Sequence, residues 1–343
     1  HAGLCSAYVE LYDETGDAEE IRQAEVACAA ALRSDSRLYM VHSALGALYA
    51  NTGRLTDAEQ AFRNALDINT KDVRAMAGLA DIYRRTQRFS EAEELFITAI
   101  DTQPGNWRTV NGYGRFLFTM GRYHDAAEQF RLVVSIDPDN ATARSNLGSA
   151  LMLAAEFEEA RQVLEETVAR EPIAKTYSSL GVILYYLADF EESVDSHRQA
   201  AELTPSDDVV WLNLADSLHF AGRTDESTDA YTRAREISAA RLDVDSSDGV
   251  AMTTLAWAEH MLGDSEAALK LIDKSLQIDP EDPYTYYYDA LIRYQTGDSD
   301  AALNSLAAAL EKGYPPGLLV AEPALGEIRA DDRFSAIIVE NIR

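Results

Sequence analysis

Two histidines with an aspartate nearby are the side chains that come closest to a catalytic or metal-binding set. His219 and His260 lie in neighbouring parts of the chain, and Asp216 precedes the first by three positions. Imidazole and carboxylate groups together could bind a metal ion or relay a proton. A metal site would need further ligands, and the sequence offers no obvious ones near these three. We therefore expect both histidines to form hydrogen bonds in a groove and predict no metal and no cofactor.

Motifs for nucleophilic or phosphate chemistry are not found in the sequence. It has no G-x-x-x-x-G-K-[ST], G-x-S-x-G, H-E-x-x-H or C-x-x-C pattern. Carboxylate pairs such as Glu158 and Glu159 fall where helices are expected to begin, and there negative charge complements the helix dipole. The sequence thus predicts a chain that is not an enzyme, so that any catalytic domain would lie N-terminal to it.

Cys5 and Cys28 are the only cysteines in the 343 residues. They match no metal-binding spacing and no disulfide framework. They could be close in space, but we expect small buried thiols, with a mild preference for a reducing compartment.

The charge balance excludes some classes of partner. Thirty basic residues against 58 acidic ones give a net charge of −28. Nucleic acid binding needs clustered Lys and Arg, so nucleic acid is not expected as a partner.

No apolar run approaches the length of a membrane span, so no membrane insertion of this segment is expected. The chain starts at His1 with helical patterning, which suggests a fragment of something longer. We expect a cytoplasmic location, or a periplasmic one if a membrane span precedes the fragment. The oligomeric state is not indicated.

A period of about 34 residues runs through the chain. Small residues recur at nearly constant intervals, at Gly46, Ala80, Gly114, Gly148, Gly181, Ala215, Ala256 and Ala290, with one longer interval after Ala215. Two helices packed side by side need a small residue where their backbones approach most closely. Glycines such as Gly53 and Gly121 follow, where a first helix must end. Each repeat is thus predicted to be two helices joined by a turn.

Other positions strengthen the pattern. Counting the small residue as position 8, alanine recurs at position 20 (Ala58, Ala92, Ala126, Ala160, Ala268, Ala302). A large apolar residue recurs at position 24 (Phe62, Phe96, Phe130, Leu164, Tyr231, Ile272, Leu306), and proline at position 32 (Pro104, Pro138, Pro172, Pro205, Pro280). This spacing resembles the tetratricopeptide repeat family, whose signature is W-x2-L-G-x2-Y, then A-x3-F, then P.

The resemblance implies an all-α fold, a right-handed α-solenoid superhelix of about nine helix-turn-helix units with a C-terminal capping segment. Residues 1–38 form a degenerate first unit and 315–343 a capping tail. The regular units are predicted at 39–72, 73–106, 107–140, 141–173, 174–207, 208–248, 249–282 and 283–314. The longest unit, 208–248, carries seven extra residues, nearly two helical turns, so we expect a longer second helix ending near Leu242.

In this family the first helices line a concave face, with positions 2, 5, 6, 9, 12 and 13 pointing into it. Applied here, that implies an arginine-rich wall in 73–140, although those residues hold eight basic and nine acidic side chains. Towards the other end the groove becomes aromatic. In YTYYYDALIRY, residues 284–294, one tyrosine falls at a core position and four face the groove, unless the tail folds back and covers them. The predicted peptide-binding residues are Arg74, Arg84, Arg85, Arg108, Asn111, Arg115, Asn146, Tyr185, Tyr186, Asn213, His219, Trp257, His260, Tyr284, Tyr287, Tyr288 and Tyr294.

Such a surface suits an extended protein segment. Arginine pairs with carboxylates, and tyrosine offers rigid apolar area with a polar tip. We expect an acidic partner with hydrophobic anchors, its acidic part on the arginine side. The Lys and Asn clamp of chaperone-binding relatives is not found, and position 6 holds asparagine only at Asn146 and Asn213, which is no asparagine ladder.

The chain ending ALEKGYPPGLLVAEPALGEIRADDRF resembles the C-terminal repeat region of bacterial multidomain signalling proteins, in which a serine/threonine kinase, a cyclase or a winged-helix regulator precedes the repeats. This implies the recruiting or sensing arm of a larger protein. A free-standing scaffold, assembly factor or chaperone is the alternative, and a regulatory segment of a transferase is disfavoured by the missing ladder.

Overall fold

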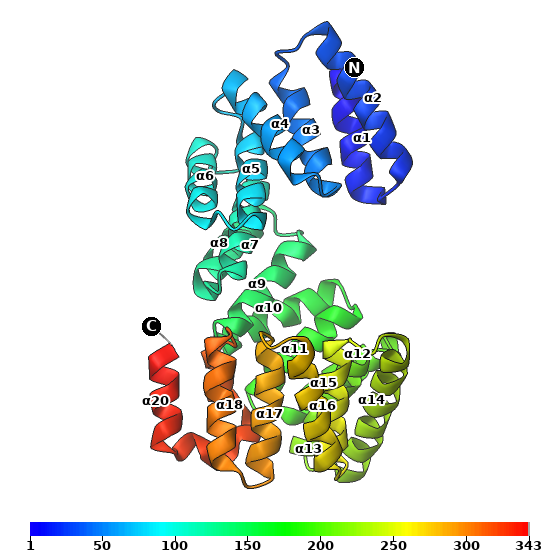
Figure 1. Cartoon of the computed structure of the whole chain (residues 1–343), viewed down its shortest axis with the longest axis vertical. Coiled ribbons are helices and arrows are strands. Elements are labelled where there is room, and N and C mark those ends of the chain that lie inside the picture. Colours follow the sequence, from blue (N-terminus) through cyan, green and yellow to red (C-terminus); the bar gives the residue numbers. More distant parts are fainter. Residues whose placement is uncertain (342–343) are drawn as a thin grey trace. The chain divides into compact units, whose positions relative to one another are not determined.

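The structure is all-α. The computed structural model describes residues 1–341, apart from the side chains of Asp13, Glu14, Glu327 and Asn341, and contains no strand within that range. Successive helices pack as hairpins, nine in the described residues before the C-terminal tail (Figure 1). The predicted all-α fold of consecutive helix pairs is therefore confirmed. The chain divides into two compact units, residues 1–143 and 144–343.

The first unit holds four complete hairpins. Their helices are α1 (Ala2–Thr15) with α2 (Ala18–Ser34), α3 (Tyr39–Asn51) with α4 (Leu55–Ile68), α5 (Val73–Arg85) with α6 (Phe89–Thr102), and α7 (Trp107–Thr119) with α8 (Tyr123–Ile136).

The second unit takes in most of α9 and all later helices. Its hairpins are α9 (Ala141–Leu153) with α10 (Phe157–Arg170), α11 (Ala174–Tyr186) with α12 (Phe190–Leu203), α13 (Asp208–Phe220) with α14 (Thr224–Val244), α15 (Gly249–Met261) with α16 (Ser265–Ile278), and α17 (Pro283–Gln295) with α18 (Ser299–Glu311). No helix within residues 1–341 is both long enough and apolar enough to cross a bilayer.

The helices of a pair touch through the small and large residues of the repeat. A Cβ atom added to Gly46 would lie 2.5 Å from the ring of Phe62, and one added to Gly114 would lie 2.7 Å from Phe130. Both phenylalanines are buried. The small residue at position 8 therefore makes room for the large residue at position 24 of the same unit, as the packing argument predicts.

The turn between paired helices uses the left-handed backbone region whether or not glycine is present. Gly53 and Gly222 have φ of 76° and 75° at this turn. In three other hairpins the equivalent residues are Gln87, Ala155 and Ala188, with φ of 61°, 59° and 62°. A side chain in this region costs about 1–2 kcal/mol per residue. The packing of the helix pair thus imposes the turn even where the sequence lacks glycine.

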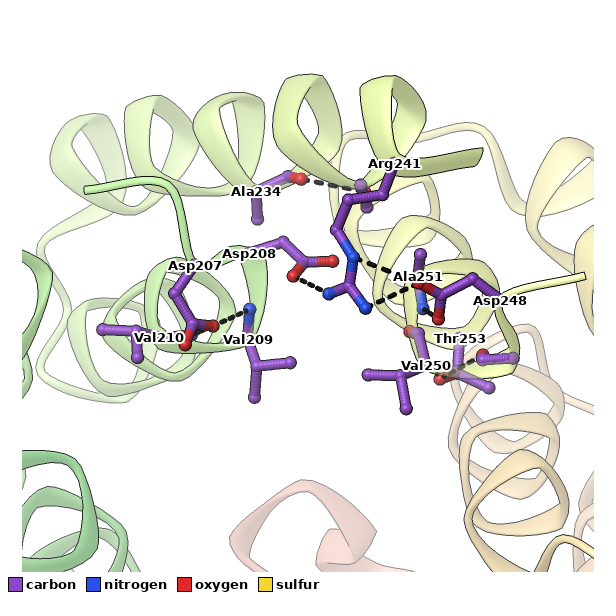
Figure 2. A network of polar contacts seen from close by, with 12 residues as sticks. Asp207, Asp208, Val209, Val210, Ala234, Arg241, Asp248, Val250, Ala251 and Thr253 are labelled. Carbon is purple, nitrogen blue, oxygen red and sulfur yellow. Dashed lines mark hydrogen bonds and ion pairs between the residues drawn. The ribbon is translucent and has the colours of Figure 1, made fainter. Parts of the chain in front are cut away.

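The longest unit has a long second helix. α14 spans 21 residues and ends at Val244, which confirms the predicted lengthening of this helix. Its last turns carry Arg241, which lies between two aspartates (Figure 2). The guanidinium donates to Asp208, which is fully buried at the start of α13, and at 2.7 Å to Asp248, the N-cap of α15. The extra turns therefore fasten α14 to the helices on either side of it in the chain.

The first hairpin is closed by a disulfide bond between Cys5 on α1 and Cys28 on α2. The prediction that both cysteines are free thiols is wrong. Both are fully buried, as expected, in a cluster with Val9, Ala24 and Val41. Their sequence separation of 23 residues resembles no known framework, but helix pairing brings the two side chains face to face.

The tail forms α19 (Pro316–Ala321), a 3₁₀ segment η1 (Pro323–Ala330) and α20 (Asp332–Asn341). α20 packs against α18 (Figure 1), and η1 packs against α17. Apolar side chains from all three segments are buried: Leu318, Leu319, Leu325, Ile328, Phe334 and Ile338. The tail thus covers the outer helix of the last pair and also reaches the inner one.

Candidate binding site: an aromatic cavity bordered by the tail

A cavity of about 190 Å³ lies in the second unit, against the first helices of five consecutive pairs. These helices are α9, α11, α13, α15 and α17, and the remaining lining comes from the tail, Tyr314 and His197 of α12. The resemblance implies that these same first helices line a concave face, and the cavity lies against them. Its lining residues are Met152, Leu153, Val182, Tyr185, Tyr186, His197, Asn213, Asp216, Trp257, Tyr284, Tyr287, Tyr288, Leu291, Tyr314, Leu318, Glu322 and Ala324.

Asp216 connects three neighbouring helices at one side of the cavity. Its Oδ1 atom accepts a hydrogen bond of 2.6 Å from the Tyr231 hydroxyl on α14 and one of 2.8 Å from Trp257 Nε1 on α15. Asp216 and Trp257 are separated by the length of the longest unit, so they occupy the same position on successive first helices. The repeat itself therefore brings them together.

Glu322 comes from the tail and is 1% exposed. Its carboxylate accepts hydrogen bonds of 2.6 Å from the Tyr287 hydroxyl and 2.8 Å from the Tyr185 hydroxyl. The backbone N–H of Ala324 donates a third, at 3.0 Å. Three donors satisfy a buried carboxylate that no arginine or lysine contacts in the described residues. The groove thus already holds one acidic side chain, that of its own chain.

Tyr314, the residue directly before the tail, completes the aromatic wall. Its ring stacks on Tyr287, with centroids 4.8 Å apart, and meets Tyr284 edge-on at 5.3 Å. Its hydroxyl is hydrogen-bonded to that of Tyr186. Stacked and edge-on rings are favourable arrangements for aromatic pairs. Tyr287 also bonds Glu322 of the tail, so the tail partly covers the tyrosine-rich end, the alternative that the sequence left open.

The electrostatic character of the cavity follows from burial. Burial raises the pKa of Asp216 to about 7, with Glu322 adding to the rise and the two donors opposing it. Burial also raises the pKa of Glu322, against the effect of its hydrogen bonds and of Arg329. Burial lowers the pKa of His197 to about 4, so its imidazole is neutral at pH 7. Among the described lining residues there is no lysine and no arginine.

Seven of the predicted binding residues line this cavity: Tyr185, Tyr186, Asn213, Trp257, Tyr284, Tyr287 and Tyr288. Asn146, His219, His260 and Tyr294 lie on first helices that border the cavity but do not line it. His260 bonds Ser265 at 2.9 Å and Gln295 at 3.0 Å, and its ring lies against Trp257. His219 is exposed and meets Phe220 edge-on. No group of three potential metal ligands is found in the described part of the chain.

The remaining predicted residues belong to the first unit, on α5 and α7. Several of the arginines already have partners there. Arg84 pairs with Asp81 at 2.8 Å, and Arg85 donates to the Ala50 carbonyl at 2.8 Å. Arg74 lies 3.7 Å from Glu10, and Arg108 lies over the ring of Trp107. Arg115 is exposed, and Asn111 is half-buried.

Sequence reasoning missed Glu322, Tyr314 and His197. The sequence around Glu322 could have indicated its role, because Glu322 is the one acidic residue in the apolar run PPGLLVAEPALG. A lone acid in a stretch that must pack against the last repeat needs a buried partner. Tyr314 and His197 lie outside the first-helix positions to which the family's pattern was applied, so that pattern did not reach them.

Comparisons with known proteins agree with this architecture. Two family models described as tetratricopeptide repeat match the chain, one over residues 208–281 and the other over 49–111 and 117–179, together more than half of its length. Among curated proteins, the peroxisomal targeting signal receptor of Candida albicans is 31% identical over 64 residues, 19% of this chain and 11% of the receptor. That of Saccharomyces cerevisiae is 33% identical over 58 residues, 17% of this chain and 10% of the receptor. The matched stretches thus span about a tenth of these relatives.

Solved structures share the fold. A tetratricopeptide repeat protein from Parabacteroides merdae superposes with a TM-score of 0.54 and 16% identity, covering 76% of this chain and 99% of that one. The C-terminal part of a repeat protein from Cytophaga hutchinsonii gives 0.50 and 17%, covering 70% and 96%. With matching repeat models, helix pairs in series and position-specific packing of small against large residues, this chain is a tetratricopeptide repeat protein.

Proposed function

We propose that this chain is a non-catalytic protein–protein interaction module whose concave face binds an extended segment of a partner protein. The main support for the proposal is the buried position of Glu322. Its carboxylate accepts hydrogen bonds from the hydroxyls of Tyr185 on α11 and Tyr287 on α17. Tyrosine hydroxyls that converge on a carboxylate from two different repeats form a recognition site for an acidic side chain in an extended segment.

The seated tail indicates what such a segment would look like. Leu318 and Ala324, on either side of Glu322, contribute apolar surface to the same cavity. An acidic residue with aliphatic neighbours is the chemistry expected from the sequence. The site for the acid is proposed at the tyrosine end, because the arginines of the first unit that were expected to receive it mostly have partners within that unit.

The biological setting is a further part of the proposal. The curated relatives are receptors for a targeting signal, which supports recognition of a short peptide, although only a tenth of their length is matched. The recruiting or sensing arm of a larger bacterial signalling protein remains our preferred setting, with a free-standing scaffold, assembly factor or chaperone as the alternative. Disulfides persist in oxidising environments, so the Cys5–Cys28 bond supports the periplasmic location over the cytoplasmic one.

A synthetic peptide with the sequence GLLVAEPALG, residues 317–326, tests the site. Fluorescence anisotropy would compare its binding to the wild-type chain and to Glu322→Ala, in which the carboxylate site is vacated. The variant is expected to bind the labelled peptide and the wild type to bind it at least about tenfold more weakly, because the wild-type tail competes for the site. Glu340→Ala, a change at an exposed tail residue, serves as the control and should behave as wild type.

Two results would contradict the proposal. One is a lack of peptide binding to a Glu322→Ala chain whose helicity matches the wild type. The other is equal binding after Tyr185→Phe and Tyr287→Phe are added to that variant, since the peptide's carboxylate would then not be using these hydroxyls.

A further inference from the structure

The tail borders the cavity without filling it. With Glu322 in place, about 190 Å³ remains open between the tail and the first helices. An engineered protein cavity of about 150 Å³ is large enough to hold benzene. The space left here can therefore hold a small organic group while the tail is seated, and this possibility does not depend on the proposed function.

The walls of the cavity consist largely of aromatic rings. Trp257 and Tyr288 lie with ring centroids 6.0 Å apart, and Tyr287 meets Tyr288 edge-on at 5.1 Å. Tyr185, Tyr186, Tyr284 and Tyr314 add further rings to the lining. The electron-rich faces of such rings attract a cation within about 6 Å, and groups of them form the cages that bind organic ammonium ions.

The charged side chains that line the cavity in the described part of the chain are acidic. Asp216 and Glu322 both line it, and the described lining residues include no lysine or arginine. Both carboxylates have raised pKa values because they are buried, and Glu322 adds to the rise at Asp216. A bound anion would meet two carboxylates, whereas a bound cation would compensate them.

One acceptor atom remains available. Asp216 uses Oδ1 for both of its hydrogen bonds, from Tyr231 and Trp257, and its Oδ2 receives none from the described residues. Trp257 donates to this same carboxylate, and its ring lies tilted against that of Tyr288. The carboxylate and the aromatic pair all line the cavity. An N–H group placed there would bond a carboxylate and touch aromatic rings at once.

We propose that this cavity binds an aliphatic ammonium group, with an N–H donated to Asp216 Oδ2 and the hydrocarbon part packed against Trp257 and Tyr288. The group could belong to a free small amine or to a lysine side chain of a partner. Both sources present the same chemistry, and separate probes distinguish them.

Isothermal titration calorimetry on the full chain tests the proposal, above the pKa of about 7 that burial gives Asp216, so that this carboxylate is charged. The probes are n-butylammonium, 1-butanol as its neutral counterpart of the same shape, and Nα-acetyl-lysine N-methylamide. For a ligand of this size we expect n-butylammonium to bind with a Kd of about 1 mM, and butanol at least about tenfold more weakly.

Three variants assign the site. Asp216→Asn keeps an oxygen for Tyr231 and Trp257 but removes the charge, and it should weaken n-butylammonium binding at least about tenfold. Asp243→Asn makes the same change at an exposed residue of α14 and should leave binding unchanged. Tyr288→Leu removes an aromatic face without changing any charge and should also weaken n-butylammonium binding. This variant still tests the site if Asp216→Asn does not fold.

Each outcome is informative. If both n-butylammonium and the lysine probe bind, the ammonium group is that of a partner's lysine side chain. If only n-butylammonium binds, it is that of a free small amine. The proposal is wrong if butanol binds as well as n-butylammonium, if Asp216→Asn and Tyr288→Leu bind as the wild type does, or if no probe binds. Failure of the tail-peptide assay would leave this result standing, since the amine is expected to bind with the tail in place.

Discussion

The Tyr287 hydroxyl donates a hydrogen bond of 2.6 Å to Glu322, which lies 35 residues further along the chain. This bond joins α17, the first helix of the last repeat, to the tail that follows it. Helix packing alone does not account for a buried carboxylate at Glu322 or for the tyrosine hydroxyl of Tyr287 that faces the cavity. The hydrogen bond between them accounts for both.

Removing this bond should destabilise the second unit. Tyr287→Phe leaves the ring stacked on Tyr314 but takes one of three donors from a buried carboxylate, and we expect a loss of about 1–3 kcal/mol of unfolding free energy. Urea denaturation followed by circular dichroism measures it. Tyr286→Phe, the neighbouring residue, loses only a 3.3 Å bond to the Pro280 carbonyl and should cost less. Equal losses in the two variants would mean that Glu322 does not depend on Tyr287.

The aspartate network around Arg241 predicts a large effect from one surface-facing arginine. Arg241→Ala would leave Asp208 fully buried without its cation, and we expect a loss of about 3–5 kcal/mol. Arg233→Ala, on the same helix, breaks only an exposed pair with Glu236 and should cost about 1 kcal/mol or less. Thermal denaturation of both variants gives the comparison. A double change, Asp208→Asn with Arg241→Met, should recover much of the loss, and its failure to do so would show that the charge of Asp208 is not the cause.

The disulfide predicts a redox-sensitive first hairpin. Closing a loop of 23 residues is expected to contribute about 3 kcal/mol, chiefly by restricting the unfolded chain. Dithiothreitol should therefore lower the melting temperature of the wild type but leave that of the double variant Cys5→Ser, Cys28→Ser unchanged. If the protein is denatured without a reducing agent and then reacts with a thiol reagent, the disulfide bond had not formed.

Asp216 predicts an unusual dependence of stability on pH. Its pKa is raised from the ordinary value of 3.8 to about 7 in the folded protein, so folding favours the protonated form. The stabilisation is complete below about pH 4 and is lost as the pH rises through 7. The side chain at position 216 faces Tyr231, Trp257 and Glu322 in both the wild type and Asp216→Asn. The pKa of Glu322 is raised as well. The unfolding free energy of the wild type should therefore fall relative to that of Asp216→Asn between about pH 4 and pH 7 and level off above that range.

Chemical denaturation at several pH values measures this difference, and Asp243→Asn controls for the change in net charge. Profiles for wild type and Asp216→Asn that run parallel across the range would contradict a raised pKa at Asp216.

The repeat could be predicted from sequence because its signals are local and recur. Gly46 and Phe62 occur at the same spacing and in the same phase as Gly114 and Phe130, so one packing rule is seen several times. The same register predicts the aromatic side of the cavity, because Tyr185, Trp257 and Tyr288 occupy inward positions on the first helices α11, α15 and α17. The Cys5–Cys28 bond could not be inferred in this way, since it occurs once and in the degenerate first unit. Glu322 was missed for a similar reason: the tail follows no repeat, and its partners lie up to 137 residues away.

That last distance has a consequence for how the second unit unfolds. In a solenoid each repeat contacts only its neighbours, so terminal repeats normally open first and independently. Glu322 bonds Tyr185 on α11 as well as Tyr287 on α17, and α12 to α16 lie between these helices in the chain. The terminal hairpin cannot separate without also breaking a contact three repeats earlier. The second unit should therefore unfold as one cooperative block, with uniform hydrogen-exchange protection from α11 to α18 in place of a gradient that weakens towards the C-terminus.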